Sequence, residues 1–297
     1  MAESEPIRGL WCASLAPFDE RGRADHDRLV GHIHALLARG VDGVVLFGTT
    51  GEGVSCSVAE RAEGLESMLA AGIPPARLAV STGCAGLPDA VALTRHAVSS
   101  GCPRCLVLPP FFWKRLPEEA VFRYYAALIE SVADARLRLY LYHLPDLSGV
   151  PIGADLAASL AAAYPGIVAG VKDSGAAFGH TERLLKRLPG LSILVGHEPD
   201  LPRSIRAGGA GTICGLANLF PELVAAVLKP DAAAEDERRL RAVLDILQRY
   251  PMVPAFKVVR AAQSDDAGWS RVRLPLLLLP EGECRELLAC LKEAGFS

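Results

Sequence analysis

The sequence has no run of about 18 uncharged apolar residues, so no segment of it resembles a membrane-spanning helix. Its opening segment, MAESEPIRGL, carries two acidic side chains and no apolar stretch, which is unlike a secretory signal. We therefore expect a cytoplasmic protein that does not bind a membrane.

Neither sign of charge dominates, because 31 Lys and Arg residues are balanced by 34 Asp and Glu residues. Without a broad positive field, the chain lacks the electrostatic features of a nucleic-acid-binding protein. We expect its partner to be a small molecule instead. With 297 residues, 51% of them hydrophobic, the chain is long enough to bury a large core.

Cysteine is too scattered for a disulfide framework. The eight cysteines are spread along the whole chain, which is typical of reduced thiols. Cys102 and Cys105 form a CxxC, but no second CxxC and no HxxxH follows to complete a tetrahedral zinc site. We expect two buried thiols and no bound metal.

The chain does contain short apolar runs that alternate with helical patterns. Most of the runs are continuous, as expected of parallel strands covered on both faces. They are Gly9–Leu15, Gly43–Phe47, Arg77–Thr82, Cys105–Leu108, Leu137–Tyr142, Ile167–Val171, Ser192–Val195 and Gly211–Cys214. Their ends recur roughly every 20 to 35 residues, about the length of a βα unit, so the pattern predicts an α/β fold, a (β/α)₈ TIM barrel. The alternative, a doubly wound open sheet, lacks its GxGxxG signature here.

Helical patterns fill the gaps and continue beyond the last strand. Asp25 is a candidate N-cap of the first helix, and Gly40 lies just past its end. Pro117 and two glutamates open a later helix. Three amphipathic patterns follow the eighth strand. We therefore expect a barrel over residues 1–230 and a C-terminal helical extension over residues 231–297.

Polar residues at the carboxyl ends of barrel strands converge on one face, so the active site is sought there. Lys172 ends the sixth apolar run, VAGVK, although only six of the 31 basic residues are lysines. Apolar walls favour the neutral form of an amine, which can attack a ketone and form a Schiff base. The alternative is a structural ion pair with Asp173 or Glu198.

Two other strand ends carry side chains that can transfer protons. Tyr142 ends the fifth run, and its phenol is suited to general acid–base catalysis, although a packing role is the alternative. His143 and His197 follow strands five and seven. Each imidazole can contact a substrate oxygen or serve a structural role.

The loop after the second strand is rich in hydroxyl and glycine residues. Thr49 and Thr50 lie between Gly48 and Gly51, so backbone amides and hydroxyls can surround an anion such as a carboxylate. An ordinary βα turn of the same composition is the alternative.

These motifs, GTTGE, YHLP and GVKDS in that order, resemble the dihydrodipicolinate synthase / N-acetylneuraminate lyase family, and the resemblance covers nearly the whole chain. It implies a barrel with a C-terminal helical extension, usually assembled as a homotetramer from two dimers. It also implies a class I mechanism in which Lys172 forms an imine with pyruvate or another 2-oxo acid, without a metal or organic cofactor. Tyr142 is then the proton shuttle and Thr49 its relay.

The resemblance assigns further residues to the substrate pocket. Thr50 and the loop amides would hold the carboxylate. The other implied pocket residues are Gly48, Gly51, His143, Gly196, Glu198 and Ile213. Phe112 occupies the position of the tyrosine that a neighbouring subunit usually adds to the relay, and a phenyl ring carries no proton.

Other departures bear on the substrate. Leu147 replaces the arginine that receives the second substrate in the synthases. Gly215 replaces a lyase serine, and Glu198 is followed by Pro199 where the lyases have an acidic pair. His143 replaces the usual asparagine. The pocket lined by these residues together with Phe111, Phe112 and Trp113 is expected to be more apolar than that of either enzyme.

We therefore predict a class I lyase or aldolase that cleaves or forms a 2-keto-3-deoxy acid, with pyruvate as one product. Within the family, the alternatives are a dihydrodipicolinate synthase, which joins pyruvate to aspartate semialdehyde, and a keto-deoxy sugar acid dehydratase. Outside catalysis, the alternative is a sensor that binds 2-oxo acids.

Overall fold

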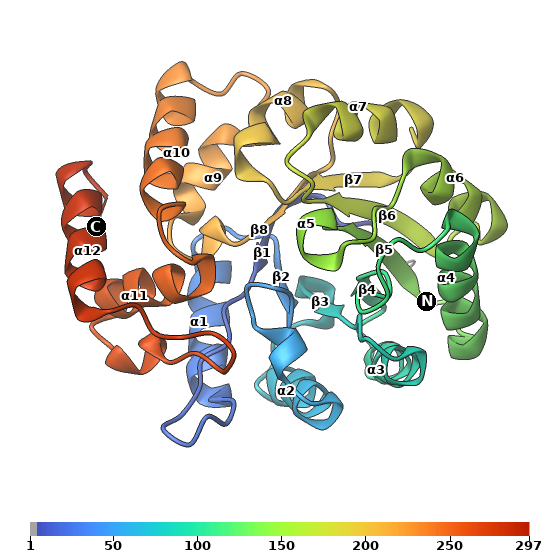
Figure 1. Ribbon diagram of the computed structural model, residues 1–297, viewed down its shortest axis with the longest axis horizontal. Coiled ribbons are helices and arrows are strands. Elements are labelled where there is room, and N and C mark those ends of the chain that lie inside the picture. The colour runs from blue at the N-terminus through green and yellow to red at the C-terminus, as the bar shows by residue number, and fades with distance from the viewer. Residues whose placement is uncertain (1–4, 297) are drawn as a thin grey trace.

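The computed structural model describes residues 5–296. Residues 1–4, which belong to the opening segment that we expect not to be a secretory signal, lie outside it. Eight parallel strands form a closed barrel in chain order, with β8 pairing to β1 (Figure 1). The strands are β1 (Gly9–Ala13), β2 (Gly43–Leu46), β3 (Leu78–Ser81), β4 (Arg104–Val107), β5 (Arg138–His143), β6 (Val168–Asp173), β7 (Ser192–Val195) and β8 (Gly211–Cys214). The predicted barrel is confirmed, and each strand lies within about two residues of its predicted bounds.

Helices surround the barrel and cover the outer face of the strands (Figure 1). They are α1 (His26–Ala38), α2 (Val58–Ala70), α3 (Leu87–Ser99), α4 (Glu118–Val132), α5 (Pro145–Ser148), α6 (Ala154–Ala163), α7 (Phe178–Arg187), α8 (Leu201–Arg206) and α9 (Pro221–Val227). Short 3₁₀ turns are η1 (Gly53–Ser55), η2 (Pro75–Arg77), η3 (Glu198–Asp200) and η4 (Leu216–Asn218). As predicted, the Asp25 side chain accepts from the Arg28 N–H to cap α1, and Gly40 has a φ of +85°.

Alternation along the strands divides the core into two layers, because successive side chains point to opposite faces. One layer fills the barrel interior and includes Trp11, Tyr140, Tyr142 and Ile213. The other packs between the strands and the helices and is much larger. Tyr142 and Lys172 are register partners on β5 and β6, as are the next residues, His143 and Asp173. Tyr142 and Lys172 therefore share the inner face, and the following pair shares the outer face.

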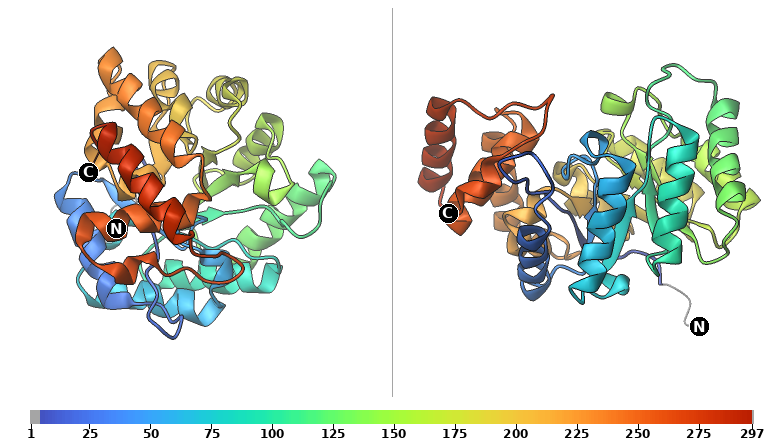
Figure 2. Two further views of the ribbon diagram at one scale, coloured as in Figure 1. Left: turned by 60° about the vertical axis from the view of Figure 1, so that its left-hand side comes forward. Right: turned by 90° about the horizontal axis from the view of Figure 1, so that it is seen from below.

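The predicted C-terminal helices are α10 (Ala234–Leu247), α11 (Met252–Ser264) and α12 (Glu281–Glu293), with η5 (Ala267–Ser270) between the last two. They form a group on one side of the barrel, next to α1 (Figures 1 and 2). Arg28 on α1 donates from Nε to Asp266 Oδ2 at 2.7 Å, and His32 packs edge-on against Trp269. Across residues 5–296, every helix is too short or too polar to cross a membrane.

The Cys102–Cys105 motif lies at the start of β4, and both side chains are completely buried. Burial raises the pKa of Cys102 to about 11 and raises that of Cys105 further. Both thiols therefore stay protonated at neutral pH and are poor metal ligands or nucleophiles.

Candidate active site

Lys172 and Tyr142 meet at the carboxyl ends of β6 and β5, inside the barrel. Lys172 Nζ lies 3.2 Å from the Tyr142 hydroxyl and 4.3 Å from the centre of its ring. Thr49 Oγ1 lies 3.3 Å from the same hydroxyl. Lys172 and Tyr142 are 5% and 3% exposed, so an amine and a phenol form a buried hydrogen bond that continues to the half-buried Thr49 hydroxyl.

The loop that carries Thr49 has an unusual backbone at both ends. Phe47 and Glu52 have φ values of +57° and +53°, in the left-handed region that non-glycine residues rarely adopt. Glu52 N–H donates to the Thr49 carbonyl and Gly53 N–H to the Gly48 carbonyl, both at 3.1 Å, which closes the loop on itself.

The inner part of this loop offers hydrogen-bond donors. Among the described residues, the N–H groups of Thr49, Thr50 and Gly51 have no protein acceptor. Consecutive free amides of this kind form an anion-binding concavity. Thr50 is only 5% exposed, so its hydroxyl lies beneath the surface with them. This is a suitable place for a substrate carboxylate.

Two glycines make room around these groups. A Cβ on Gly196 would lie 2.8 Å from Lys172 Cε and 2.0 Å from Ser174 Oγ. Any larger residue at this position would therefore displace the Lys172 side chain. A Cβ on Gly215 would lie 3.1 Å from Thr50 Oγ1. By contrast, a Cβ on Gly48, another predicted pocket residue, would meet no atom within 4 Å.

Glu198 opens η3, just beyond the end of β7. Its Oε1 accepts from the Leu216 N–H at 3.2 Å, which ties η3 to η4. Burial raises the pKa of Glu198, and the nearby Lys172 charge opposes that shift. This carboxyl group is therefore a second ionisable group close to the amine.

His143 lies on the outer face of β5, away from Lys172, although the sequence suggested a pocket residue. Its Nδ1 accepts from the Ile152 N–H at 3.0 Å, and its ring stacks on His180 with centroids 3.9 Å apart. Burial, with the neighbouring His180, lowers the pKa of His143 to about 4. The ring is a neutral packing element that supports the strand.

Asp173 connects this outer group. It accepts hydrogen bonds from His180 Nδ1 at 2.9 Å and from the Thr181 hydroxyl at 2.8 Å. Burial alone would raise the pKa of Asp173, but the His180 hydrogen bond and the Gly175 N–H bring it below its usual value. These hydrogen bonds hold the Asp173 side chain in place, directly after Lys172 on β6.

The ligand-type atoms of His143, Asp173 and His180 lie within 4.8 Å of one another, as in a metal site. Their hydrogen bonds argue against one. Since His143 Nδ1 accepts from an amide, a metal on Nε2 would leave both ring nitrogens without a proton. A hydrogen bond between His180 and Asp173, with the His143 ring stacked on His180, is the better description.

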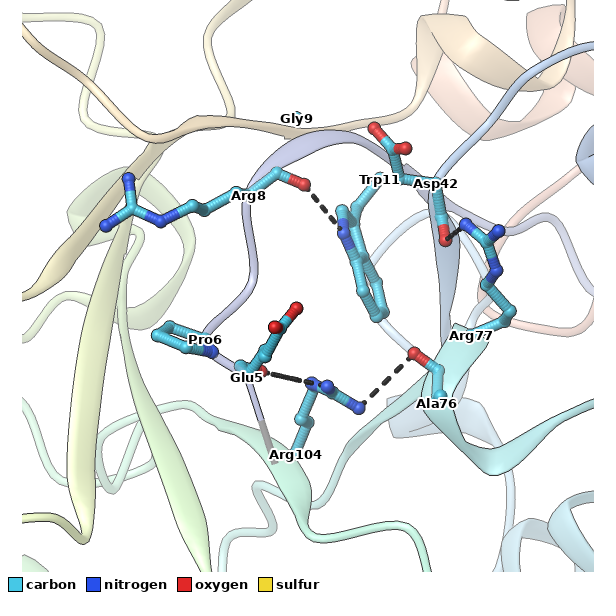
Figure 3. A pocket seen from close by; sticks show the side chains of 9 residues that line it. All are labelled: Glu5, Pro6, Arg8, Gly9, Trp11, Asp42, Ala76, Arg77 and Arg104. Carbon is cyan, nitrogen blue, oxygen red and sulfur yellow. Dashed lines mark hydrogen bonds between the residues drawn. The ribbon is translucent and has the colours of Figure 1, made fainter. Parts of the chain in front are cut away.

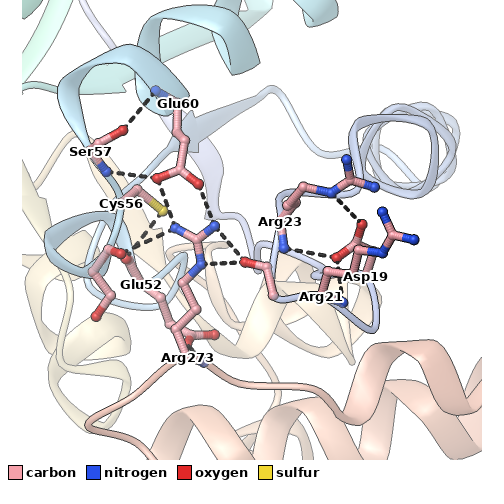
Figure 4. Close-up of polar contacts among 10 residues, drawn as sticks. Asp19, Arg21, Arg23, Glu52, Cys56, Ser57, Glu60 and Arg273 are labelled. Carbon is pink, nitrogen blue, oxygen red and sulfur yellow. Dashed lines mark hydrogen bonds and ion pairs between the residues drawn. The ribbon is translucent and has the colours of Figure 1, made fainter.

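A buried ion pair behind the GTTGE loop was not foreseen. Glu52 and Lys257 are 2% and 0% exposed and form a direct ion pair, and Lys257 also donates to the Arg271 carbonyl at 2.6 Å. The other Glu52 oxygen accepts from the Arg273 N–H at 2.8 Å. Arg273 pairs in turn with Glu60 (Figure 4). The C-terminal extension thereby anchors the back of the loop.

Apolar side chains are exposed around the mouth. Phe112 and Trp113, which follow β4, are 70% and 66% exposed, and Leu147 on α5 is 63% exposed. Lys114 links the two segments by donating to the Ser148 carbonyl at 2.8 Å.

The structure thus brings together most of the predicted site. Lys172, Tyr142, Thr49, Thr50 and Gly196 converge, with Glu198 close by. Ile213 is fully buried in the interior layer, His143 faces outward, and Phe112 is exposed on the rim. Sequence reasoning missed Ser174, beside Gly196, and the Glu52–Lys257 pair. A charge inside the apolar run VPAFKVV was the available signal for Lys257.

A parallel barrel that holds a buried lysine beside a tyrosine at the carboxyl ends of its strands has the architecture of a class I aldolase. The chain belongs to the Dihydrodipicolinate synthetase family, whose profile it matches over residues 6–294. The family prediction is confirmed, and the chain is a lyase of the class I aldolase type.

Three similar proteins illustrate the family. An "Uncharacterized DapA-like lyase" of Chloroflexus aurantiacus is 38% identical, with 96% of each chain covered. The crystal structure of dihydrodipicolinate synthase from Agrobacterium tumefaciens has a TM-score of 0.91 and 34% identity, covering 97% of this chain and 99% of that one. A 2-dehydro-3-deoxy-D-gluconate/2-dehydro-3-deoxy-phosphogluconate aldolase of Thermoproteus tenax is 29% identical, covering 73% of this chain and 67% of its own.

Proposed function

We propose that this enzyme cleaves or forms a 2-keto-3-deoxy acid through a Schiff base between Lys172 and the 2-oxo group. The hydrogen bond of 3.2 Å between Lys172 Nζ and the Tyr142 hydroxyl carries the proposal. The proposal is supported because an amine and a phenol, 5% and 3% exposed, lie together near a loop with free amides, as Schiff-base formation with proton transfer requires.

The steps follow from these groups. The Lys172 amine adds to C2 of the 2-oxo acid, and loss of water gives an iminium ion. A base takes the C4 hydroxyl proton, the C3–C4 bond breaks, and its electron pair remains on C3 as an enamine while the aldehyde leaves. Protonation of C3 and hydrolysis of the iminium release pyruvate. The iminium carries the chemistry, so the mechanism calls for no separate cofactor.

Tyr142 and the loop supply the remaining functions. The phenol lies next to the amine and to Thr49 Oγ1, so it can take up a proton and pass it to the threonine hydroxyl. The free amides of the loop and the Thr50 hydroxyl hold the substrate carboxylate. Glu198, whose pKa is raised by burial, is a further ionisable group near Lys172.

The apolar rim favours a substrate without a second carboxylate. Leu147 is exposed at the mouth, where a guanidinium would be needed to bind an acidic acceptor such as aspartate semialdehyde. Similarity to the Agrobacterium synthase keeps dihydrodipicolinate synthesis as the second candidate. Comparing the two substrates separates these functions directly.

We also propose that copies of the chain assemble into a tetramer of two dimers. The exposed aromatic rim of Phe112 and Trp113 is the kind of surface that a soluble protein covers with a partner. Light scattering after size-exclusion chromatography should give the mass of four chains. A Trp113→Glu variant should shift it to a smaller species, and a monomeric wild-type protein would contradict the proposal.

Trapping the imine tests the proposed function. The protein is incubated with pyruvate, reduced with borohydride and weighed. We expect one pyruvate-derived adduct per chain on the peptide that contains Lys172, no adduct in Lys172→Ala, and an unchanged adduct in the control Lys186→Ala on α7. An adduct that persists in Lys172→Ala would refute the assignment.

Turnover then separates the functions. Keto-deoxy sugar acids should release pyruvate faster than aspartate semialdehyde is consumed. Loss of water without pyruvate release would indicate a dehydratase. An adduct without turnover on any substrate would indicate a sensor.

A further inference from the structure

A cleft opens at the opposite end of the barrel from Lys172. It is a cleft of about 800 Å³ at the amino ends of β1 and β4, open to solvent (Figure 3). The side chains that give it chemical character are Glu5, Arg8, Trp11, Asp42, Arg77 and Arg104. The proposed catalytic chemistry uses none of them.

Arg104 is the buried cation of this cleft. It is the first residue of β4 and only 7% exposed. Its Nε and Nη2 donate to the Glu5 carbonyl at 3.1 and 2.8 Å, and its Nη1 reaches the Ala76 carbonyl at 3.3 Å. These carbonyl groups accept hydrogen bonds from the Arg104 guanidinium but do not neutralise its positive charge. A guanidinium has five N–H donors, so it retains capacity for an anion.

The other two guanidinium groups are also without carboxylate partners. Within residues 5–296, none of Arg8, Arg77 and Arg104 forms an ion pair. Arg77 donates to the Asp42 carbonyl at 2.7 Å, and the Asp42 carboxylate instead accepts from the Leu10 N–H at 2.8 Å. Figure 3 shows Arg77 and Arg8 on opposite sides of Trp11, with the Arg8 guanidinium extending away from the other two. Three positive groups face two carboxylates, so the cleft has a net positive charge.

Trp11 supplies an apolar wall. Its ring is 4% exposed and lies 5.8 Å from the Arg104 guanidinium carbon. Its indole N–H is already occupied by the Arg8 carbonyl at 3.1 Å, so the ring offers a face and no further donor. A ligand here meets forked cationic donors with the nearly buried indole ring behind them.

We propose that this cleft binds a small molecule with two anionic groups, a dicarboxylate or a phosphate ester. Arg104 holds one group at the base of the cleft, and Arg77, or Arg8 from the opposite side, holds the other at its entrance. Forked donors of this kind bind carboxylate and phosphate oxygens in pairs. This site is independent of the 2-oxo acid site, because its residues lie at the other end of the strands.

Calorimetry and tryptophan fluorescence with malonate, citrate and inorganic phosphate test the proposal, with malonamide as the uncharged control. These probes have no ketone that could react with Lys172. We expect saturable binding of at least one anion, one per chain, with a change in fluorescence. Trp11→Phe should remove the fluorescence change and keep the calorimetric signal. Tighter binding of malonate would indicate a dicarboxylate ligand, and tighter binding of inorganic phosphate would indicate a phosphate ester.

The variants locate the bound anion. Arg8→Gln/Arg77→Gln removes two exposed charges without disturbing the core and should weaken binding by about tenfold or more. The matched double variant Arg183→Gln/Arg241→Gln, with the same charge change on the helical layer, should bind normally. Arg104→Lys keeps the buried charge but loses the fork, and should also weaken binding.

Two results would overturn the proposal. One is the absence of saturable binding by any of the three anions. The other is binding that survives Arg8→Gln/Arg77→Gln but disappears in Lys172→Ala, because the anion would then occupy the catalytic end. Failure of the imine test with normal anion binding would affect only the proposed function.

Discussion

Glu52 and Lys257 form a completely buried ion pair between the GTTGE loop and the C-terminal extension. Glu52 comes directly after Gly51, so the pair holds the loop from behind. Burial lowers the pKa of Lys257, and the Glu52 charge opposes that shift. The extension is therefore part of the structure that supports the proposed carboxylate site.

Breaking this pair should destabilise the fold. Lys257→Met leaves the Glu52 carboxylate buried without its cation, and such a loss typically costs about 3–5 kcal/mol. Chemical denaturation should show this loss, and any folded variant should have a raised KM for pyruvate. Adding Glu52→Gln should recover part of the stability, because no unpaired charge remains. A single variant as stable as wild type would show that the pair contributes nothing.

Removing the Tyr142 hydroxyl should affect catalysis more than structure. Tyr142→Phe keeps the ring in the barrel interior but removes the group that contacts Lys172 and Thr49. We expect kcat to fall by roughly 10² to 10⁴, the usual contribution of a positioned acid or base. Circular dichroism should be unchanged. Wild-type turnover would exclude the phenol from proton transfer.

Gly196→Ala should interfere with the lysine itself. The added methyl group would contact Lys172 Cε and Ser174 Oγ at less than normal distances, so the amine must move. We expect the rate of pyruvate adduct formation to fall by about tenfold or more, because misplacement of a reacting atom is costly. Gly190→Ala, where the new methyl group meets nothing within 4 Å, is the control. Equal adduct rates in both variants would be inconsistent with this geometry.

His143 should make stability depend on pH. Burial lowers its pKa to about 4, while a histidine in the unfolded chain titrates near 6.5. Between these values the unfolded chain binds more protons, so this contribution to stability is lost as pH falls from about 6.5 to about 4.

Substitution isolates that contribution from other groups. His143→Asn keeps an acceptor for the Ile152 N–H and removes the titration beside Asp173 and His180. Wild type should therefore lose stability relative to this variant as the solution is acidified through that range. Urea denaturation at several pH values measures the difference. His34→Asn, on the exposed side of α1, should follow wild type.

The barrel was predictable because its strands are continuous apolar runs at regular intervals, and strand ends locate Lys172 and Tyr142 directly. His143 was placed in the pocket because it follows Tyr142, yet a strand sends adjacent side chains to opposite faces. Applying that alternation from Tyr142 would have placed His143 correctly. The apolar run VPAFKVV marks Lys257 as a buried charge, but its pairing with Glu52 depends on how the extension docks on the barrel, a contact between segments far apart in the chain.

The left-handed residues Phe47 and Glu52 fix the shape of the GTTG segment at both of its ends. Because these conformations are costly outside glycine, the surrounding packing must impose them whether or not a ligand is bound. An arriving carboxylate therefore meets a receptor that is already shaped, and little ordering entropy is lost on association. Recognition here depends on rigidity built in during folding.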